Sequence, residues 1–116
     1  MSDETDIHEL SRQFTLRMYE TFKALDNLGY TASRFHQMLI QENDGVAVAR
    51  RLVIGGDSAG LERLQKMGRL DLSVEMWVLR PKYEQLFDQT TREYASAKLS
   101  AMGFDVDAEI RREESI

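Results

Sequence analysis

The chain has 116 residues, of which 42% are hydrophobic and 30% charged, and its formal net charge is −5. This length favours a single domain, and the apolar content is sufficient for a core, which excludes a fully disordered chain. Neither an apolar run of about 18 residues, as a membrane span requires, nor a signal-peptide pattern is found. Because there is no cysteine, disulfides and thiolate sites are excluded, and we expect a cytoplasmic protein with no membrane contact.

The charge is distributed unevenly along the chain. Residues 1–30 carry a net charge of −3, residues 31–82 carry +2, and residues 83–116 carry −4. Nucleic-acid-binding proteins usually have a much larger basic excess, because their affinity depends on neutralising phosphates. The composition therefore disfavours nucleic acid as a partner, and we expect the basic middle to form a mixed, solvated surface.

A long helix is predicted over residues 6–28. Apolar residues recur there at spacings of three and four and form one stripe, while acidic residues near its start suit the positive end of the helix dipole. Gly29 can adopt the left-handed conformation that ends a helix. Leu16 and Tyr19 lie off the stripe, so we expect a second surface, either another helix or another subunit, to contact them.

Two shorter helices are predicted to follow, over residues 31–42 and 44–54. Thr31 is the predicted N-cap of the first, and Asp44 is the predicted cap of the second. The second segment is rich in β-branched residues, which makes it the least secure of the helical predictions because a strand would also accommodate them.

Glycines mark the next boundaries. Gly55 and Gly56 begin a loop, and either Asp57 or Ser58 is predicted to cap a short helix that ends at Gly68. Another helix is predicted to begin shortly after Gly68.

That helix begins at Asp71 or Ser73 and is apolar on most of its circumference, so we expect it to be the central, buried one. Pro81 cannot continue this helix and suits the first turn of the next element, residues 81–87.

Asp88 is the predicted cap of the last helix, residues 88–102, and Gly103 is its predicted stop. Residues 1–106 are thus predicted as one domain, and residues 107–116 as a charged, frayed tail. The predicted fold is a compact, irregular all-α bundle of five to six helices, with one long N-terminal helix followed by shorter ones. The predicted core comprises Phe14, Met18, Phe22, Phe35, Leu39, Leu52, Leu61, Leu64, Leu72, Trp77, Val78, Leu86, Phe87 and Leu99.

A distinctive set of residues lies in the second half of the chain. It consists of Gly60-Leu61, Arg63-Leu64, the run Gly68-Arg69-Leu70-Asp71-Leu72-Ser73-Val74-Glu75, Val78-Leu79, Tyr83, Leu86-Phe87, Ala95, Leu99 and Gly103-Phe104. In these residues the chain resembles a small all-helical family of bacterial and phage-associated proteins, over roughly residues 35–105. Members of that family occur as short chains or as modules beside nuclease or defence-type domains. The resemblance implies a helical fold, and it implies no catalytic residue.

The charged residues of this run have two interpretations. Arg69 can pair with Asp71 or Glu75 across a helix–helix corner, and Asp71 or Glu75 suits the positive end of the next helix dipole. We favour this structural interpretation. In the functional alternative, Arg69, Asp71 and Glu75 line a partner-binding groove.

Catalytic groups are scarce. His8 and His36 lack a partner at the spacing of a zinc site, and Asp71 with Glu75 supplies only two oxygens where Mg²⁺ or Ca²⁺ needs about six. Ser58 lies between glycines, as in a nucleophile elbow, but no histidine follows His36. We therefore predict that the protein is not an enzyme and has no metal or cofactor.

A protein partner or a second copy of the chain is the preferred prediction. Aromatic residues beside arginine are typical of interface cores. The candidate partner-binding residues are Leu16, Arg17, Tyr19, Arg69, Arg80, Lys82 and Tyr83.

The alternative is a nucleic-acid-associated regulator that uses a helix-turn-helix-like element at residues 31–54. Its candidate phosphate-binding residues are Arg50 and Arg51. Its second helix would begin with Gly45-Val46-Ala47-Val48, which offers base edges no side-chain hydrogen bonds. This hypothesis therefore ranks second.

Overall fold

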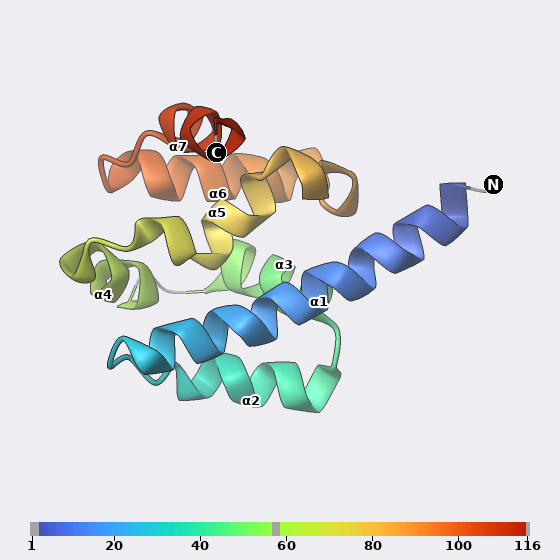
Figure 1. Cartoon of the computed structure of the whole chain (residues 1–116), viewed down its shortest axis with the longest axis horizontal. Coiled ribbons are helices and arrows are strands. Elements are labelled where there is room, and N and C mark those ends of the chain that lie inside the picture. Colours follow the sequence, from blue (N-terminus) through green and yellow to red (C-terminus); the bar gives the residue numbers. More distant parts are fainter. Residues whose placement is uncertain (1–2, 57–58, 116) are drawn as a thin grey trace.

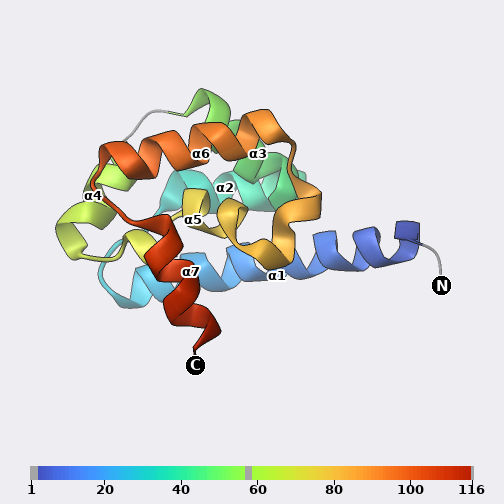
Figure 2. The same ribbon diagram turned by 90° about the horizontal axis from the view of Figure 1, so that it is seen from above.

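The longest element of the computed structural model, which describes residues 3–56 and 59–115, is the 25-residue helix α1 (Asp3–Asn27). Its first turns project beyond all the other helices (Figures 1 and 2). Phe14, Met18 and Leu25 of its apolar stripe are buried, as the spacing predicts. Neither α1 nor any other described helix is long and apolar enough to cross a membrane.

Shorter helices follow α1 in close succession. They are α2 (Ser33–Glu42), α3 (Gly45–Gly55), α4 (Ala59–Met67), the 3₁₀ helix η1 (Leu70–Leu72), α5 (Val74–Leu79), the 3₁₀ helix η2 (Pro81–Leu86), α6 (Gln89–Ala101) and α7 (Val106–Glu114). The all-α prediction, with one long helix before shorter ones, is confirmed. The helices outnumber the predicted five to six, and the valine-rich segment is helical, as α3, rather than a strand.

Helix α5 lies at the centre of the bundle. It packs against α3 and α6, while α1 and α2 lie on one side of it and α7 lies with α6 on the other (Figure 1). Met76 and Val78 of α5 are fully buried. On the α1 side, Phe14 makes edge-on ring contacts with Tyr83 and Phe87, with centroids 5.2 and 5.1 Å away. The predicted central position of this helix is confirmed.

The predicted helix stops depend on local backbone geometry. Gly29 has φ +93° after α1, and Gly103 has φ +76° after α6, a region that side chains disfavour. In both turns a backbone N–H reaches back to a carbonyl of the last helical turn, from Tyr30 to Leu25 at 2.9 Å and from Phe104 to Leu99 at 3.0 Å. These contacts are the reason that a glycine after the last apolar residue is a reliable stop.

The predicted caps have mixed outcomes. Asp44 accepts hydrogen bonds from the N–H groups of Val46 and Ala47, at 3.1 and 3.2 Å, and so caps α3. Asp88 caps α6 by accepting from the N–H of Thr91 at 2.8 Å. Both predictions are confirmed.

At α5 the cap is Ser73, whose hydroxyl accepts from the N–H of Met76 at 3.1 Å, rather than Asp71. The prediction that Asp57 or Ser58 caps α4 lies outside the described residues.

Thr31 is not the cap of α2, so that prediction is wrong. The helix begins at Ser33, its N-cap position is Ala32, and no side chain caps it. The hydroxyl of Thr31 instead hydrogen-bonds to the carboxylate of Asp26, at the end of α1. The threonine thus stabilises the turn between the two helices. Because its hydroxyl is bonded to Asp26, it does not cap α2.

The frayed tail is also a wrong prediction, because residues 107–114 belong to α7. Asp105 caps this helix by accepting from the N–H of Ala108 at 3.0 Å, and Ile110 packs against the core. The high charge of the segment suggested a solvated tail. One of those charges, Glu113, forms an ion pair with a residue 33 positions earlier, which holds the helix against the bundle.

Most of the predicted core is buried, but its outer members are only partly so. The partly buried members are Phe22, Leu52, Leu72, Trp77 and Leu86. The predicted core omits several buried residues, among them Tyr83, which is only 2% exposed, and Met76, which is fully buried.

Candidate functional site

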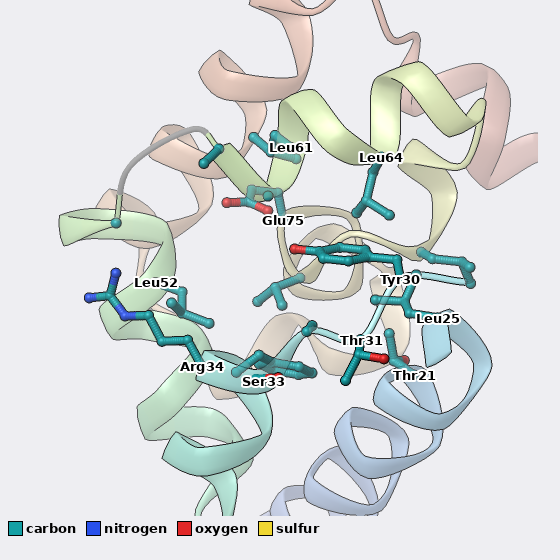
Figure 3. Close-up of a pocket in the computed structure, with 17 residues that line it drawn as sticks. Thr21, Leu25, Tyr30, Thr31, Ser33, Arg34, Leu52, Leu61, Leu64 and Glu75 are labelled. Atoms are coloured by element: carbon teal, nitrogen blue, oxygen red, sulfur yellow. The ribbon is translucent and has the colours of Figure 1, made fainter. Parts of the chain in front are cut away.

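A pocket of about 350 Å³ opens between the ends of α1 and α3, the start of α2, and helices α4 and α5 (Figure 3). This volume lies at the lower end of the range for ligand pockets, about 300–1,000 Å³. Its walls are mostly apolar. The aliphatic side chains that line it are Leu25, Ala32, Leu52, Ala59, Leu61, Leu64, Leu72 and Val74.

Tyr30 forms the wall between the α1–α2 turn and α4. The Gly29 turn directs the chain so that the Tyr30 ring lies beside the pocket, and the guanidinium of Arg63 lies over this ring, 4.9 Å from its centroid. Arg63 Nη2 also donates to the carbonyl of Gly29 at 3.5 Å. On the pocket side, a Cβ added at Gly60 would lie 3.6 Å from the Tyr30 hydroxyl, an ordinary contact.

The charged group inside this pocket is Glu75, which Figure 3 shows among the leucines of α4. It lies in the first turn of α5 and is only 7% exposed. The Lys98 ammonium, from α6, lies 3.7 Å from Glu75 Oε2. Lys98 also donates to the carbonyl oxygens of Leu52 and Gly56, at 3.3 and 3.4 Å, and thereby links α6 to the end of α3.

Burial raises the pKa of the Glu75 carboxyl above its ordinary value, because desolvation disfavours the charged form. The backbone N–H of Glu75 and the ammonium of Lys98 act in the opposite direction but do not cancel this effect. The arrangement therefore presents an incompletely compensated carboxyl group to an apolar pocket. Such a group can bind a cation or exchange a hydrogen bond.

The structure separates the three charged residues of the distinctive run. Arg69 Nε and Nη2 donate to the two carboxylate oxygens of Asp71 at 3.0 and 3.1 Å, which is the predicted structural ion pair. Neither residue lines the pocket, whereas Glu75 does. The groove formed by all three, our functional alternative, is therefore not formed.

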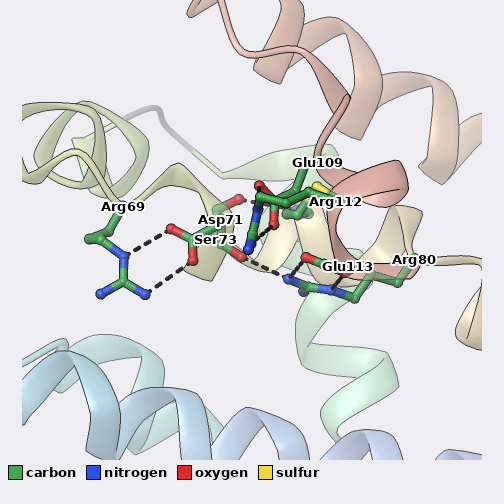
Figure 4. A network of polar contacts seen from close by, with 8 residues as sticks. Arg69, Asp71, Ser73, Arg80, Glu109, Arg112 and Glu113 are labelled. Carbon is green, nitrogen blue, oxygen red and sulfur yellow. Dashed lines mark hydrogen bonds and ion pairs between the residues drawn. The ribbon is translucent and has the colours of Figure 1, made fainter. Parts of the chain in front are cut away.

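Arg80 holds α7 in place (Figure 4). Its Nε and Nη2 donate to the two carboxylate oxygens of Glu113 at 2.9 and 2.8 Å, and Nη2 also donates to the carbonyl of Asp71 at 3.0 Å. The guanidinium lies over the Trp77 ring, 4.0 Å from its centroid. We call Arg80, Glu113, Asp71 and Trp77 the α7 clamp.

The prediction that Arg80, Lys82 and Tyr83, which flank Pro81, bind a partner is corrected by this arrangement. Arg80 is engaged in the α7 clamp with only 14% of its side chain exposed, and Tyr83 belongs to the core. Lys82 alone is exposed, and its ammonium lies 5.7 Å from the centroid of the Tyr83 ring. Sequence proximity to Pro81 suggested exposure, but the 3₁₀ turn of η2 directs Tyr83 inward against Phe14.

The candidate residues of α1 have different surroundings. The Tyr19 hydroxyl donates to the carbonyl of Leu39 at 3.0 Å, so the second surface that it contacts is α2, one of the two expected alternatives. Arg17 forms an ion pair with Glu20 on the same helix. Leu16 remains 44% exposed.

Arg50 and Arg51 are both exposed on α3, but carboxylates lie near them. Arg51 forms an ion pair with Glu42 of α2. Hydrogen bonds from Thr91, and to a smaller extent the positive charge of Arg50, lower the pKa of Asp88. The acidic neighbours reduce the positive potential that phosphate binding would need.

The pocket itself was missed by sequence reasoning. Neither Tyr30 nor Lys98 is among the candidate site residues that the sequence indicates. One signal was present, because Glu75 is the only charged residue in α5, which is otherwise apolar. A lone acid in a buried helix requires a partner or a ligand.

Comparison with known proteins adds no relative, since no protein-family model, curated protein or solved structure matches this chain.

Among residues 3–56 and 59–115, no group of three or more histidine, cysteine, aspartate or glutamate side chains could hold a metal ion. His36 stacks on Phe22, with ring centroids 4.0 Å apart. The function must therefore be argued from the pocket.

Proposed function

We propose that the chain is a non-enzymatic protein-interaction module whose pocket accepts an anchoring side chain of a partner protein. The observation that carries the proposal is the open pocket of about 350 Å³ with aliphatic walls and one buried carboxyl group. Binding energy at protein interfaces is concentrated in a few side chains that fill such pockets.

Leu28, an exposed apolar residue in the turn that leads to Tyr30, favours a macromolecular partner over a small molecule. It is 48% exposed and lies two residues before Tyr30, which lines the pocket. A small ligand would leave Leu28 in water, whereas a partner segment that enters the pocket can also cover its surroundings.

The chemical groups around the pocket support a non-enzymatic role. Glu75 is the one acid among its described lining residues, and no histidine accompanies it there. General acid–base and nucleophilic catalysis use a pair of such groups within hydrogen-bond distance. Binding therefore accounts for this pocket better than catalysis does.

The role proposed for this module is accessory or regulatory, in a bacterial or phage-associated system and in the cytoplasm. A second copy of the chain is included among the partners, because the projecting part of α1 exposes Ile7 and the adjoining turns expose Leu16. Light scattering of the purified protein tests self-association directly: a dimer supports it, and a strict monomer contradicts it.

Gly60 offers a specific test of the pocket. Gly60→Leu places a side chain in it without backbone strain, and Gly60→Ala is the matched control, because a Cβ there makes only one ordinary contact. Peptides selected from a random phage-displayed library on the wild-type protein should bind the Gly60→Ala variant and lose at least about tenfold in affinity for the Gly60→Leu variant. Selection of no peptide, or equal binding to both variants, would contradict the proposal.

A further inference from the structure

The same pocket carries information about the chemistry of its ligand. We infer that it selects a basic side chain with an aliphatic stem, a lysine or arginine of the partner, whose charged end reaches Glu75. This inference deepens the proposed function and rests on it. It follows from the position of one carboxyl group, from the positions of the cations around it, and from the apolar walls between that group and solvent.

The first step concerns the counter-ion. Lys98 does not line the pocket and lies 3.7 Å from the Glu75 carboxylate, which is longer than a hydrogen bond. The ammonium donates instead to the carbonyl oxygens of Leu52 and Gly56. Since a carboxylate has about four acceptor positions, Glu75 retains acceptor capacity that Lys98 does not use.

The second step excludes other ligand chemistries. An anionic side chain in the pocket would bury a like charge beside Glu75, and a purely apolar one would remove water from the carboxylate without replacing its hydrogen bonds. A cationic side chain supplies those hydrogen bonds and compensates the buried charge. Arg34, the one basic side chain that lines the pocket, is exposed at its rim, where solvent screens its repulsion.

The third step concerns the stem. Leu25, Leu61 and Leu64 are buried and line the pocket. Lysine and arginine carry methylene groups that pack along such apolar surface while the charged end binds a polar group. The combination of aliphatic walls with a single acid matches a long basic side chain better than a short polar one.

Three probes with six carbon atoms each isolate the contribution of the charged end. Binding of n-hexylammonium, n-hexanol and n-hexanoate at neutral pH and low salt is measured by NMR titration of the ¹⁵N-labelled full chain. The wild-type protein should bind n-hexylammonium about tenfold more tightly than n-hexanol, and n-hexanoate should bind most weakly. Glu75→Gln should abolish the preference for n-hexylammonium.

A second variant protects the test against a folding defect in the first. Lys98→Met removes the counter-ion and leaves Glu75 in place, so the preference for n-hexylammonium should increase by a factor of about three to ten. A cooperative thermal transition of each variant shows that it is folded. Equal binding of n-hexylammonium and n-hexanol to the wild-type protein overturns the inference, as does a preference that persists in Glu75→Gln.

The failure of the inference is distinguishable from failure of the proposed function. If the three probes bind the wild-type protein with equal affinity and none of them binds the Gly60→Leu variant, the pocket is a binding site but does not select basic groups. If no probe binds the wild-type protein, the inference is overturned, and the peptide selection then decides the proposed function by itself.

Discussion

The α7 clamp and the Glu75–Lys98 pair both join charged residues that are far apart in the sequence, yet their surroundings differ. In the clamp, Arg80 makes two hydrogen bonds to Glu113, a third to a carbonyl, and a ring contact with Trp77. Beside the pocket, Glu75 has its counter-ion at 3.7 Å and open space next to it. A charge whose partners all come from the fold serves stability, whereas an incompletely compensated charge facing a pocket is available to a ligand.

The largest effect should come from breaking the clamp. Arg80→Ala should lower the free energy of unfolding by about 2–3 kcal/mol, because it removes charge-assisted hydrogen bonds and leaves Glu113 unpaired. Arg80→Lys should recover only part of this loss, since an ammonium cannot make the two-pronged contact. Urea unfolding monitored by circular dichroism measures both.

A surface ion pair provides the control for this measurement. Arg12 pairs with Glu9 on α1, with 62% and 49% of the two side chains exposed. Arg12→Ala should leave the free energy of unfolding nearly unchanged, because solvent screens this exposed pair. If Arg80→Ala has no larger effect, the clamp does not hold α7, and the segment behaves as the frayed tail that its composition suggests.

The next effect separates the two regions by the sign of their pH dependence. The pKa of Glu75 is raised by burial, so its contribution to stability is fully present below the ordinary pKa of glutamate and is lost as the pH rises through the folded-state value. The hydrogen bonds from Arg80 lower the pKa of Glu113. The contribution of Glu113 to stability is therefore present above the ordinary pKa of glutamate and is lost as the pH falls through the pKa of Glu113 in the folded protein.

Unfolding free energies of the wild type, Glu75→Gln and Glu113→Gln across the acid and neutral range test these signs. The stability of Glu75→Gln relative to the wild type should improve as the pH rises, and that of Glu113→Gln should worsen. Parallel curves for the two variants would remove the distinction between the regions.

The smallest effect concerns the pocket walls. Gly60→Leu should leave the free energy of unfolding unchanged or raise it by about 0.5 kcal/mol, because leucine is the better helix former and the side chain enters existing space. Thermal unfolding of Gly60→Leu beside Gly60→Ala measures this change. A loss of more than about 2 kcal/mol would mean that the space is needed by the fold rather than available to a ligand.

Local signals account for the part of the fold that could be predicted. Asp44 and Asp88 cap helices because a side-chain oxygen reaches an N–H two or three residues away, which no distant contact has to support. Thr31 shows the limit of such signals, because its hydroxyl hydrogen-bonds to Asp26 on the preceding helix instead of capping α2. The resemblance to a helical family and the interaction function stay predictions.

Tyr83 shows why the candidate site was harder to predict. Its sequence neighbours are polar or charged, so local reasoning indicated exposure, but in the folded chain its ring packs against Phe14, 69 residues earlier. Nothing in the periodicity of a short 3₁₀ turn specifies which of its side chains points inward. The same holds for the pocket, whose walls come from five α-helices and from η1.

The sequence by itself determined the helical class, the long first helix, and the main stops and caps, because these depend on backbone preferences and contacts within a few residues. Only the tertiary structure decided that Glu113 meets Arg80, that Tyr83 is buried, and that Glu75 faces a pocket with Lys98 behind it. The physical reason is that burial and the pairing of charges depend on which helices pack together. The packing of the helices in turn depends on all the core side chains together, and not on any local segment.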